Sequence, residues 1–241
     1  MYAPAPFRPE RCNDCPTNPA RLRSIKFEAF RHEGKSRLKT AQVVYLARHG
    51  ETAWSLSGQH TGLTDLPLTP RGENNARQLG ERLKELHFAK VFTSPLQRAR
   101  RTCELAGFGA IAEVHRDLVE WNYGEYEGLR TEEIRVRRPG WEVFRDGFPG
   151  GESFDEIGAR ADRVIERVQS VDGPVLLFSS AHFLQILTAR CLGMRPQEGR
   201  HFLLGTASLS SLAYDGSDPA IALWNDRRHL RTSAGRDPSE P

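Results

Sequence analysis

Short apolar segments alternate with amphipathic helical patterns along most of this chain, and that alternation limits the fold more than any other feature. The segments 43–47, 90–93, 174–179, 207–214 and 220–224 predict strands. Segment 174–179 (PVLLFS) is apolar almost throughout, which is typical of a strand buried on both faces. Strands separated by helices predict a three-layer α/β/α sandwich with a mostly parallel sheet and the last strands antiparallel at one edge.

The helices between these strands are predicted from their start signals and apolar faces. Thr69 and Pro70 provide an N-cap and a first-turn proline, and Ser153 with Glu156 forms a capping box. The four helices expected are 70–86, one that Ser94 and Gln97 open as a second capping box, about 154–168, and about 182–192.

The two ends of the 241-residue chain differ in composition from its middle. Residues 1–40 contain nine Lys or Arg and four Asp or Glu, so the remaining residues sum to −2 and the formal charge of +3 comes from this extension. We therefore expect a basic, Pro- and Arg-rich extension over 1–40, a single domain over 41–230 and a disordered tail over 231–241. Because the excess charge is outside the domain, nucleic-acid binding is not expected.

Cysteine usage and hydropathy predict a protein of the reducing cytoplasm. Cys12 and Cys15 form a CxxC motif without a second pair, which is a weak zinc signal, and four cysteines in a chain of this length do not form a disulfide framework. No apolar stretch is long enough to span a bilayer, and the first thirty residues contain no signal-peptide core. We expect neither membrane association nor export, while the oligomeric state is not predicted.

Basic residues occur at the carboxyl ends of several predicted strands, where ligands bind in parallel α/β sheets. Arg48 and His49 end the first strand, residues 94–98 follow the second with Arg98 in the first turn of the next helix, and residues 179–182 follow the third. We therefore expect three distant segments to converge on one site. Two guanidinium groups and a helix N-terminus form an anion pocket, and their charge disfavours protonation of His49. A neutral imidazole there could attack a phosphoryl group whose oxygens the arginines neutralise.

A leaving alkoxide needs a proton, and Glu120, which follows a plausible strand end, is the candidate donor. Its neighbours Trp121 and Tyr123 are apolar surroundings that favour a neutral carboxyl group. The residue types alone leave an alternative open, because Glu120 could be a surface residue in a turn and Glu125 and Glu127 lie nearby.

Several ordered motifs resemble the histidine phosphatase superfamily, also called phosphoglycerate mutase-like. The first is LARHGET at 46–52, and the likeness covers about 41–230. The other matching segments are GQHTGLTDLPLTPRGE (58–73), TSPLQRARRT (93–102), LVEWNYGEYEGL (118–129), GGES (150–153) and WNDRRHL (224–230).

The resemblance implies a fold, a reaction and a set of site residues. It implies that His49 forms a phosphohistidine, that Arg48 and Arg98 bind the phosphoryl oxygens, and that Glu120 donates the proton. It places Ser55, Thr61 and Gly62 in the substrate pocket. It also implies a reaction that needs neither a metal nor a cofactor. Mutases of the family have a longer insertion between the acid and the last catalytic strand, so the short interval from Glu120 to Ser180 resembles that of the phosphatases. The motifs are most similar to those of sedoheptulose-bisphosphatase members. The expected substrate is therefore a small phosphate ester such as a sugar phosphate.

One position departs from the family pattern, which has a second histidine followed by glycine after the penultimate core strand. This chain has Ser180 and Ala181 there, with His182 following. Either His182 replaces the missing donor, since it would open a helix within about 7 Å, or the pocket lacks one donor and turns over more slowly. Two other functions stay open: a pseudophosphatase that only binds phosphorylated ligands, and a phosphoglycerate mutase-type phosphotransferase.

Overall fold

The computed structural model describes residues 42–215 and 218–230. The basic extension with Cys12 and Cys15 and the tail at 231–241 lie outside the described residues, so the predictions about them stay predictions. Among the described residues, no helix combines the length and the apolar composition that a membrane span requires.

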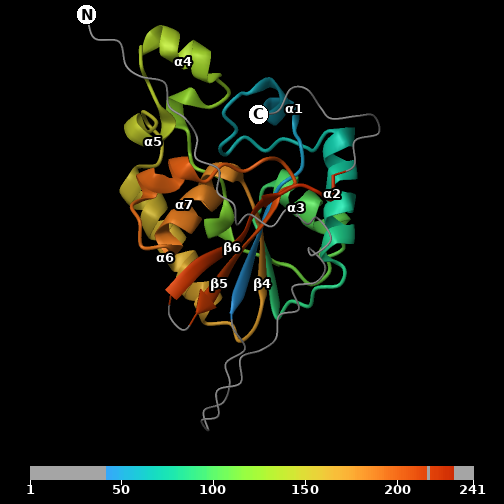
Figure 1. Ribbon diagram of the computed structural model, residues 1–241. Helices are drawn as coiled ribbons and strands as arrows, with labels where there is room; N and C mark the ends of the chain where they lie inside the picture. Colours follow the sequence, from blue (N-terminus) through green and yellow to red (C-terminus); the bar gives the residue numbers. More distant parts are fainter. Residues whose placement is uncertain (1–41, 216–217, 231–241) are drawn as a thin grey trace, which may run out of the picture. The chain divides into compact units, whose positions relative to one another are not determined.

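Six strands of the described chain form one mixed sheet in the order β3-β2-β4-β1-β5-β6 (Figure 1). Strands β1 to β4 pair in parallel, whereas β5 pairs antiparallel with both β1 and β6. The strands are β1 (Val43–Arg48), β2 (Lys90–Thr93), β3 (Glu113–Val114), β4 (Val175–Ser179), β5 (Leu209–Asp215) and β6 (Asp218–Asp226). The mostly parallel sheet with antiparallel strands at one edge is confirmed.

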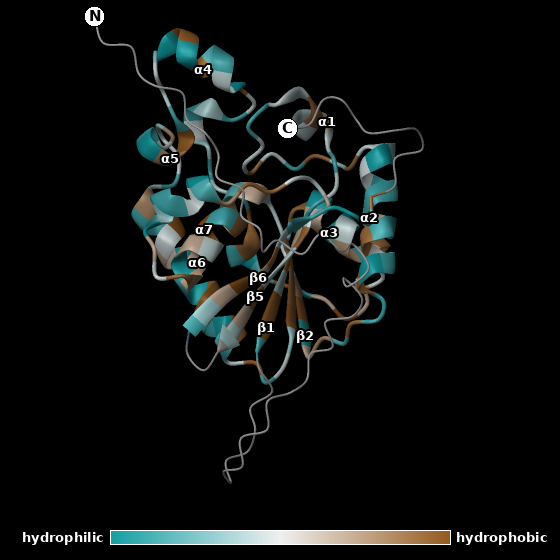
Figure 2. Ribbon diagram, viewed as in Figure 1, coloured by the Kyte–Doolittle hydropathy of each residue, from teal (hydrophilic) through white to brown (hydrophobic). Residues whose placement is uncertain are grey.

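Helices cover both faces of this sheet. The helices are α1 (Ala53–Ser57), α2 (Pro70–Leu83), α3 (Gln97–Leu105), α4 (Thr131–Arg137), α5 (Val143–Asp146), α6 (Phe154–Gln169) and α7 (Ala181–Cys191). Figure 1 shows α6 and α7 on one side of the strands and α2 and α3 on the other, while Figure 2 shows the apolar strands between them.

Alternate residues of each central strand enter the two hydrophobic cores, as the twofold period of a strand requires. On β4, Val175 and Leu177 pack in the core under α6 and α7, whereas Leu176 and Phe178 pack in the core under α2 and α3. All five β4 residues are buried, which confirms the strand predicted from PVLLFS.

The capping signals at Thr69 and Ser153 are confirmed. The Thr69 side chain accepts a hydrogen bond from the Gly72 N–H, and Ser153 and Glu156 form the reciprocal capping box of α6. Helix α2 ends at Leu83 rather than at Leu86, because the chain turns there toward β2.

Two local predictions are wrong. Ser94 does not open α3 as a capping box; the helix begins at Gln97, whose N–H donates instead to the Asp65 carboxylate at 2.7 Å. Glu120 does not follow a strand end, because a 3₁₀ turn (Arg116–Leu118) and an extended residue separate it from β3. In both cases a contact distant in sequence fixes the local backbone.

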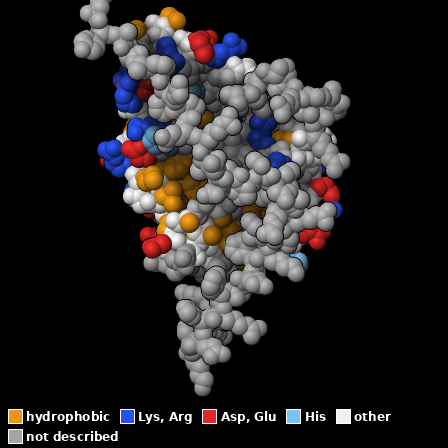
Figure 3. Space-filling view, in the orientation of Figure 1, with side chains coloured by type: hydrophobic (Ala, Val, Ile, Leu, Met, Phe, Trp, Pro, Cys, Tyr) orange, Lys and Arg blue, Asp and Glu red, His pale blue; other side chains and the backbone are white. Residues whose placement is uncertain are grey.

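Strand β6 forms one edge of the sheet and is only partly covered by described residues. Figure 3 shows apolar side chains gathered where Figure 1 places α7, β5 and β6. In contrast, β4 in the sheet interior is buried along its whole length, and it carries the candidate site together with its neighbours β1 and β2.

Candidate active site

The site lies where β1, β2 and β4 end together. Past the strand ends the backbones stay paired, since the His49 N–H donates to the Ser179 carbonyl and the Ser94 N–H donates to the Phe178 carbonyl, both at 2.9 Å. These bonds place the residues after β1, the segment before α3 and the start of α7 beside one another. The predicted convergence of three distant segments is confirmed.

His49 is held so that one ring nitrogen is left for chemistry. Its ring is buried, and Nδ1 lies 2.7 Å from the Gly50 carbonyl oxygen, so Nδ1–H donates to this acceptor and Nε2 is left unprotonated in the neutral ring. Desolvation, then the charges of Arg98 and Arg48, hold the pKa of His49 well below its ordinary value. The imidazole is therefore neutral at pH 7.

Close packing against α2 requires a glycine directly after His49. A Cβ at this position would lie 2.5 Å from the Gly72 carbonyl oxygen, so only glycine lets the first turn of α2 approach. The Gly50 N–H donates to Thr102 Oγ1 at 2.9 Å, and Thr102 lies one turn after Arg98 on α3. The loop that carries His49 is thus fixed to both helices on that face.

Arg98 is completely buried at the start of α3. Its guanidinium donates to three backbone carbonyl groups, those of Thr61 at 3.2 Å, Gly62 at 2.7 Å and Thr64 at 2.9 Å. Gly62 in turn donates its N–H to the Glu127 carboxylate at 2.8 Å. In this arrangement Gly62 holds Arg98 in position beside His49.

Several donors around His49 have no hydrogen-bond partner among the described residues. They are Nε–H of Arg48, Nε–H of Arg98 and the hydroxyl of Ser180, all buried. Ser180 is the N-cap residue of α7 and follows Ser179, to which the His49 N–H donates. Unpaired buried donors are costly, so their gathering here indicates a site built for an oxygen-rich anion.

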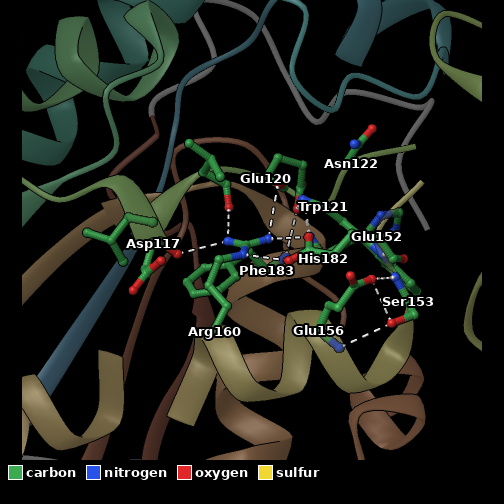
Figure 4. Close-up of polar contacts among 12 residues, drawn as sticks. Asp117, Glu120, Trp121, Asn122, Glu152, Ser153, Glu156, Arg160, His182 and Phe183 are labelled. Atoms are coloured by element: carbon green, nitrogen blue, oxygen red, sulfur yellow. Dashed lines mark hydrogen bonds and ion pairs between the residues drawn. The ribbon is translucent and has the colours of Figure 1, made fainter. Parts of the chain in front are cut away.

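Glu120 is buried, and backbone N–H groups hold both of its oxygens. Oε1 accepts from Trp121 at 2.9 Å and from Phe183 at 2.7 Å, while Oε2 accepts from His182 at 3.1 Å. Two of these donors belong to the first turn of α7, so the positive end of that helix faces the carboxyl group (Figure 4). Glu120 is therefore a site residue by position and not a surface residue in a turn.

His182 lies on the same cavity, within an aromatic cluster. Its Nδ1 is 2.6 Å from the hydroxyl of Tyr123, and its ring contacts those of Phe144, Trp121 and His60. Desolvation and the charge of Arg48 lower the pKa of His182 to about 3, so the ring is neutral. The same two kinds of effect, burial first and then the His182 charge, lower the pKa of His60 to about 4.

A cavity of about 380 Å³ opens above these groups. Of the residues proposed from sequence, it is lined by Arg48, His49, Ser55, Thr61, Glu120 and His182. Arg98, Gly62 and Ser180 lie outside this lining, although the charge of Arg98 reaches His49. The hydroxyl of Ser55 exchanges hydrogen bonds with Thr52 in the capping box of α1, so its hydrogen-bonding capacity is already used locally.

Sequence reasoning missed other residues of the cavity wall: Gln59, His60, Tyr123, Gln185, Leu203, Leu204, Gly205, Asn225 and Arg227. Gln185 is notable because it is buried and its amide oxygen has no partner among the described residues. It lies one turn after His182 on α7, so a polar residue on the inward face of this apolar helix was the available signal. In the described part of the chain, no group of three or more His, Cys, Asp or Glu is arranged to hold a metal ion.

Comparison with known proteins agrees with this geometry. Over 176 residues, which are 70% of this chain and 85% of the relative, the sequence is 40% identical to an acid phosphatase of Mycobacterium tuberculosis. It is 36% identical to the sedoheptulose 1,7-bisphosphatase of Saccharomyces cerevisiae over 218 residues, 77% of this chain and 79% of that protein.

The fold has solved counterparts. The structure of the product of an open reading frame from Mycobacterium tuberculosis superimposes with a TM-score of 0.73 and 36% identity, covering 76% of this chain and 97% of that one. Residues 44–227 match the histidine phosphatase superfamily (branch 1), and this range includes His49, Arg98, Glu120 and α7. The chain therefore belongs to the histidine phosphatase superfamily.

Proposed function

We propose that this protein is a metal-independent phosphatase that hydrolyses a small phosphate monoester through a phosphohistidine on His49. The observation that carries the proposal is a buried, neutral imidazole whose Nε2 is unprotonated, flanked by two arginines whose Nε–H groups have no partner within the described part of the chain. Such a ring is a nucleophile, and the guanidinium groups neutralise the charge that develops on phosphoryl oxygens.

In the first half-reaction, Nε2 of His49 attacks phosphorus while the bond to the ester oxygen breaks. Glu120, protonated before this step, gives its proton to the departing oxygen and becomes a carboxylate. The three backbone N–H groups that contact its oxygens would then stabilise the charge. The products of this step are the alcohol and phosphorylated His49.

In the second half-reaction, water attacks phosphorus from the side vacated by the alcohol. The Glu120 carboxylate takes one proton from this water as the P–N bond breaks. Inorganic phosphate leaves, His49 regains its neutral form, and Glu120 is again protonated, so no proton or electron is left over.

We propose that His182 supplies the donor that the family places at position 180. The hydroxyl of Tyr123, whose pKa burial raises well above its ordinary value, donates to Nδ1 of His182. The hydrogen of the neutral ring is then on Nε2, where it can donate to a substrate oxygen. The influence of Arg48 on the pKa of His182 supports a position near the phosphate.

The cavity supports a small, polar substrate such as a sugar phosphate or another phosphorylated metabolite. Its volume of about 380 Å³ suits a small molecule, and its walls carry amides and imidazoles as well as arginines. Among named relatives, the sedoheptulose 1,7-bisphosphatase acts on such an ester. Nothing in the composition of the domain supports nucleic-acid binding, and the buried, free thiol of Cys103 suits a reducing cytoplasm.

The test is to trap the intermediate. The protein is mixed with a ³²P-labelled phosphate ester and quenched during turnover, and the labelled position is mapped. We expect an acid-labile, base-stable adduct on His49, and we expect His49→Ala to abolish both adduct and phosphate release. Hydrolysis without an adduct on His49 would contradict the proposal.

The same assays separate the two alternatives. A pseudophosphatase would bind phosphorylated metabolites without releasing phosphate from any of them. A mutase would give an isomerised phosphoglycerate when a bisphosphate primer is added. We expect phosphate release and no isomerised product.

A further inference from the structure

We infer that Arg160 is a positioning residue that sets the place of the Glu120 carboxyl group and thereby its proton transfer. The inference rests on the proposed function, because it assigns Arg160 a role only through Glu120. Arg160 lies on α6, and its side chain is buried beneath the segment that carries Glu120 (Figure 4). It does not line the cavity of about 380 Å³ that holds His49, although it lines a second cavity of about 360 Å³ together with Glu120, so we assign it a role through Glu120 and not a contact with the reacting phosphate.

Every N–H of the Arg160 guanidinium has a partner on that segment or on the loop beside it. Nε and Nη2 donate to the two oxygens of Glu152 at 2.8 and 2.7 Å. Nη1 donates to the carbonyl groups of Asp117 at 2.8 Å and Val119 at 2.7 Å, and Nη2 also donates to the carbonyl of Glu120 at 3.3 Å. A planar fork with five donors is the one side chain that can satisfy this set.

Arg160 also contacts Phe183, one of the residues whose N–H groups bind the Glu120 carboxyl group. Its guanidinium carbon lies 4.5 Å from the centroid of the Phe183 ring, a cation–π contact in a buried place. The N–H of Phe183 is the nearest donor to Glu120, at 2.7 Å from Oε1. One side chain therefore touches both the backbone of Glu120 and the residue that binds its carboxyl group.

Glu152, which binds Arg160 through its carboxylate, also holds Trp121 through its backbone. The Glu152 carbonyl accepts from the Trp121 indole N–H at 2.7 Å, and the Glu152 N–H donates to the Asn122 carbonyl at 3.1 Å. Gly151 permits this approach, since a Cβ there would lie 2.3 Å from the Asn122 carbonyl oxygen. The residues on both sides of Glu120 are thus fixed by one network centred on Arg160.

Such a network matters because proton transfer depends on sub-ångström placement. A shift of about 1 Å in a catalytic group can cost ~10²-fold in rate. A lysine at position 160 keeps the charge, but its single ammonium cannot bind both oxygens of Glu152 and the carbonyl groups of 117 and 119 together. Arg160→Lys should therefore displace Glu120 while leaving His49 and Arg98 in place.

The experiment compares kcat/KM for two esters that differ in their need for an acid. p-Nitrophenyl phosphate has a good leaving group and needs little protonation, whereas glycerol phosphate has a poor one. We expect Glu120→Gln to lower kcat/KM for glycerol phosphate by ~10²-fold more than for p-nitrophenyl phosphate. Arg160→Lys should show the same selectivity at ~10-fold.

Arg163→Lys is the matched control. Arg163 lies on α6 as Arg160 does, and both contact Asp117, but Arg163 is exposed and bonds only the half-buried carboxylate of Asp117, at 3.0 Å, and not its carbonyl group. We expect equal kcat/KM to wild type on both esters. If Arg160→Lys does not fold, Glu152→Gln replaces it, because an amide nitrogen facing the guanidinium displaces the fork and should give the same selectivity.

The outcomes separate this inference from the proposed function. Suppose that Glu120→Gln lowers kcat/KM more for glycerol phosphate than for p-nitrophenyl phosphate, but Arg160→Lys and Glu152→Gln lower kcat/KM equally for both esters. Arg160 is then merely structural, and the inference is overturned. If Glu120→Gln itself is not selective, the acid role fails and the inference falls with it. Selectivity in all three variants, with none in Arg163→Lys, supports the inference.

Discussion

At the residue scale, the surroundings of His49 decide its protonation state at neutral pH. Burial removes water from the charged form, and two guanidinium groups repel it, so the pKa of His49 falls well below 6.5. The bond from Nδ1–H to the Gly50 carbonyl opposes this shift but only in part. A neutral imidazole at the carboxyl end of β1 is the result.

This shift predicts the pH dependence of the first half-reaction. Protonation of His49 removes the nucleophile, and because its pKa is lowered, this protonation needs a more acidic solution than for an ordinary histidine. We expect kcat/KM for p-nitrophenyl phosphate to stay level as pH falls through about 6.5 and to decline only below it. A decline centred at 6.5 would contradict the burial argument. Circular dichroism at each pH controls for unfolding.

The replacement of the family histidine gives a second prediction at this scale. If Nε2–H of His182 donates to the phosphate, His182→Ala should lower kcat by ~10²–10³-fold, the usual cost of one transition-state donor. Ser180→Ala, which removes a hydroxyl without a partner among the described residues, should cost less. Unchanged turnover in His182→Ala would leave the pocket one donor short of the family pattern.

At the element scale, the start of α3 depends on Asp65, thirty-two residues earlier. The Asp65 carboxylate accepts the Gln97 N–H at 2.7 Å, and its carbonyl accepts from the Gln97 side chain at 2.6 Å. The same loop presents the carbonyl groups of Thr61, Gly62 and Thr64 to Arg98. One loop therefore caps the helix and holds Arg98, the residue proposed to bind the phosphoryl group.

Loss of this cap should lower both stability and activity. We expect Asp65→Ala to reduce the free energy of unfolding by about 1 kcal/mol, as for other helix N-caps. Because the loop also holds Arg98, KM for p-nitrophenyl phosphate should rise. Glu81→Ala is the control and should change neither, because it breaks only an exposed ion pair between Glu81 on α2 and Lys84, the C-cap residue of that helix. Urea titration and steady-state kinetics measure the two effects.

Local signals explain which elements could be predicted from sequence. Thr69 and Ser153 cap helices through residues three positions away, so their patterns are visible in a short window. Ser94 fails as a cap because Asp65 competes from a distant loop. The role of Arg160 could not be predicted for the same reason, since its partners near position 120 are about forty residues away in the sequence. A single arginine in a helical pattern usually lies on the solvent-exposed face.

At the scale of the whole molecule, the site is the place where three strands end, and the fold buries polar groups there. The sequence predicts this convergence through the strand order of a parallel sheet, and it predicts His49 and Arg98 from their positions at strand and helix ends. It does not predict the cavity wall, because Gln185, Asn225 and Arg227 come together only through tertiary packing.

Burying neutral histidines makes the stability of the whole molecule depend on pH. The pKa of His60 is lowered from 6.5 to about 4, and that of His182 to about 3. In the unfolded chain these rings take up protons once the pH falls below about 6.5, whereas in the folded protein they do not until the lowered pKa is reached. The contribution of these two rings to the free energy of unfolding is therefore fully present above pH 6.5. As the pH falls from there toward 4, the free energy of unfolding declines by about 1.4 kcal/mol per pH unit for each ring.

Removing one of these rings should flatten that decline. His60→Gln takes away a group that binds a proton only in the unfolded state, so between pH 7 and 5 the variant should lose about 2 kcal/mol less than wild type. Urea unfolding at half-unit steps of pH measures the slopes. Above pH 7 the two slopes should coincide, because neither state protonates His60 there. Parallel slopes at acid pH as well would mean that the folded protein opens this cluster and protonates His60 before it unfolds.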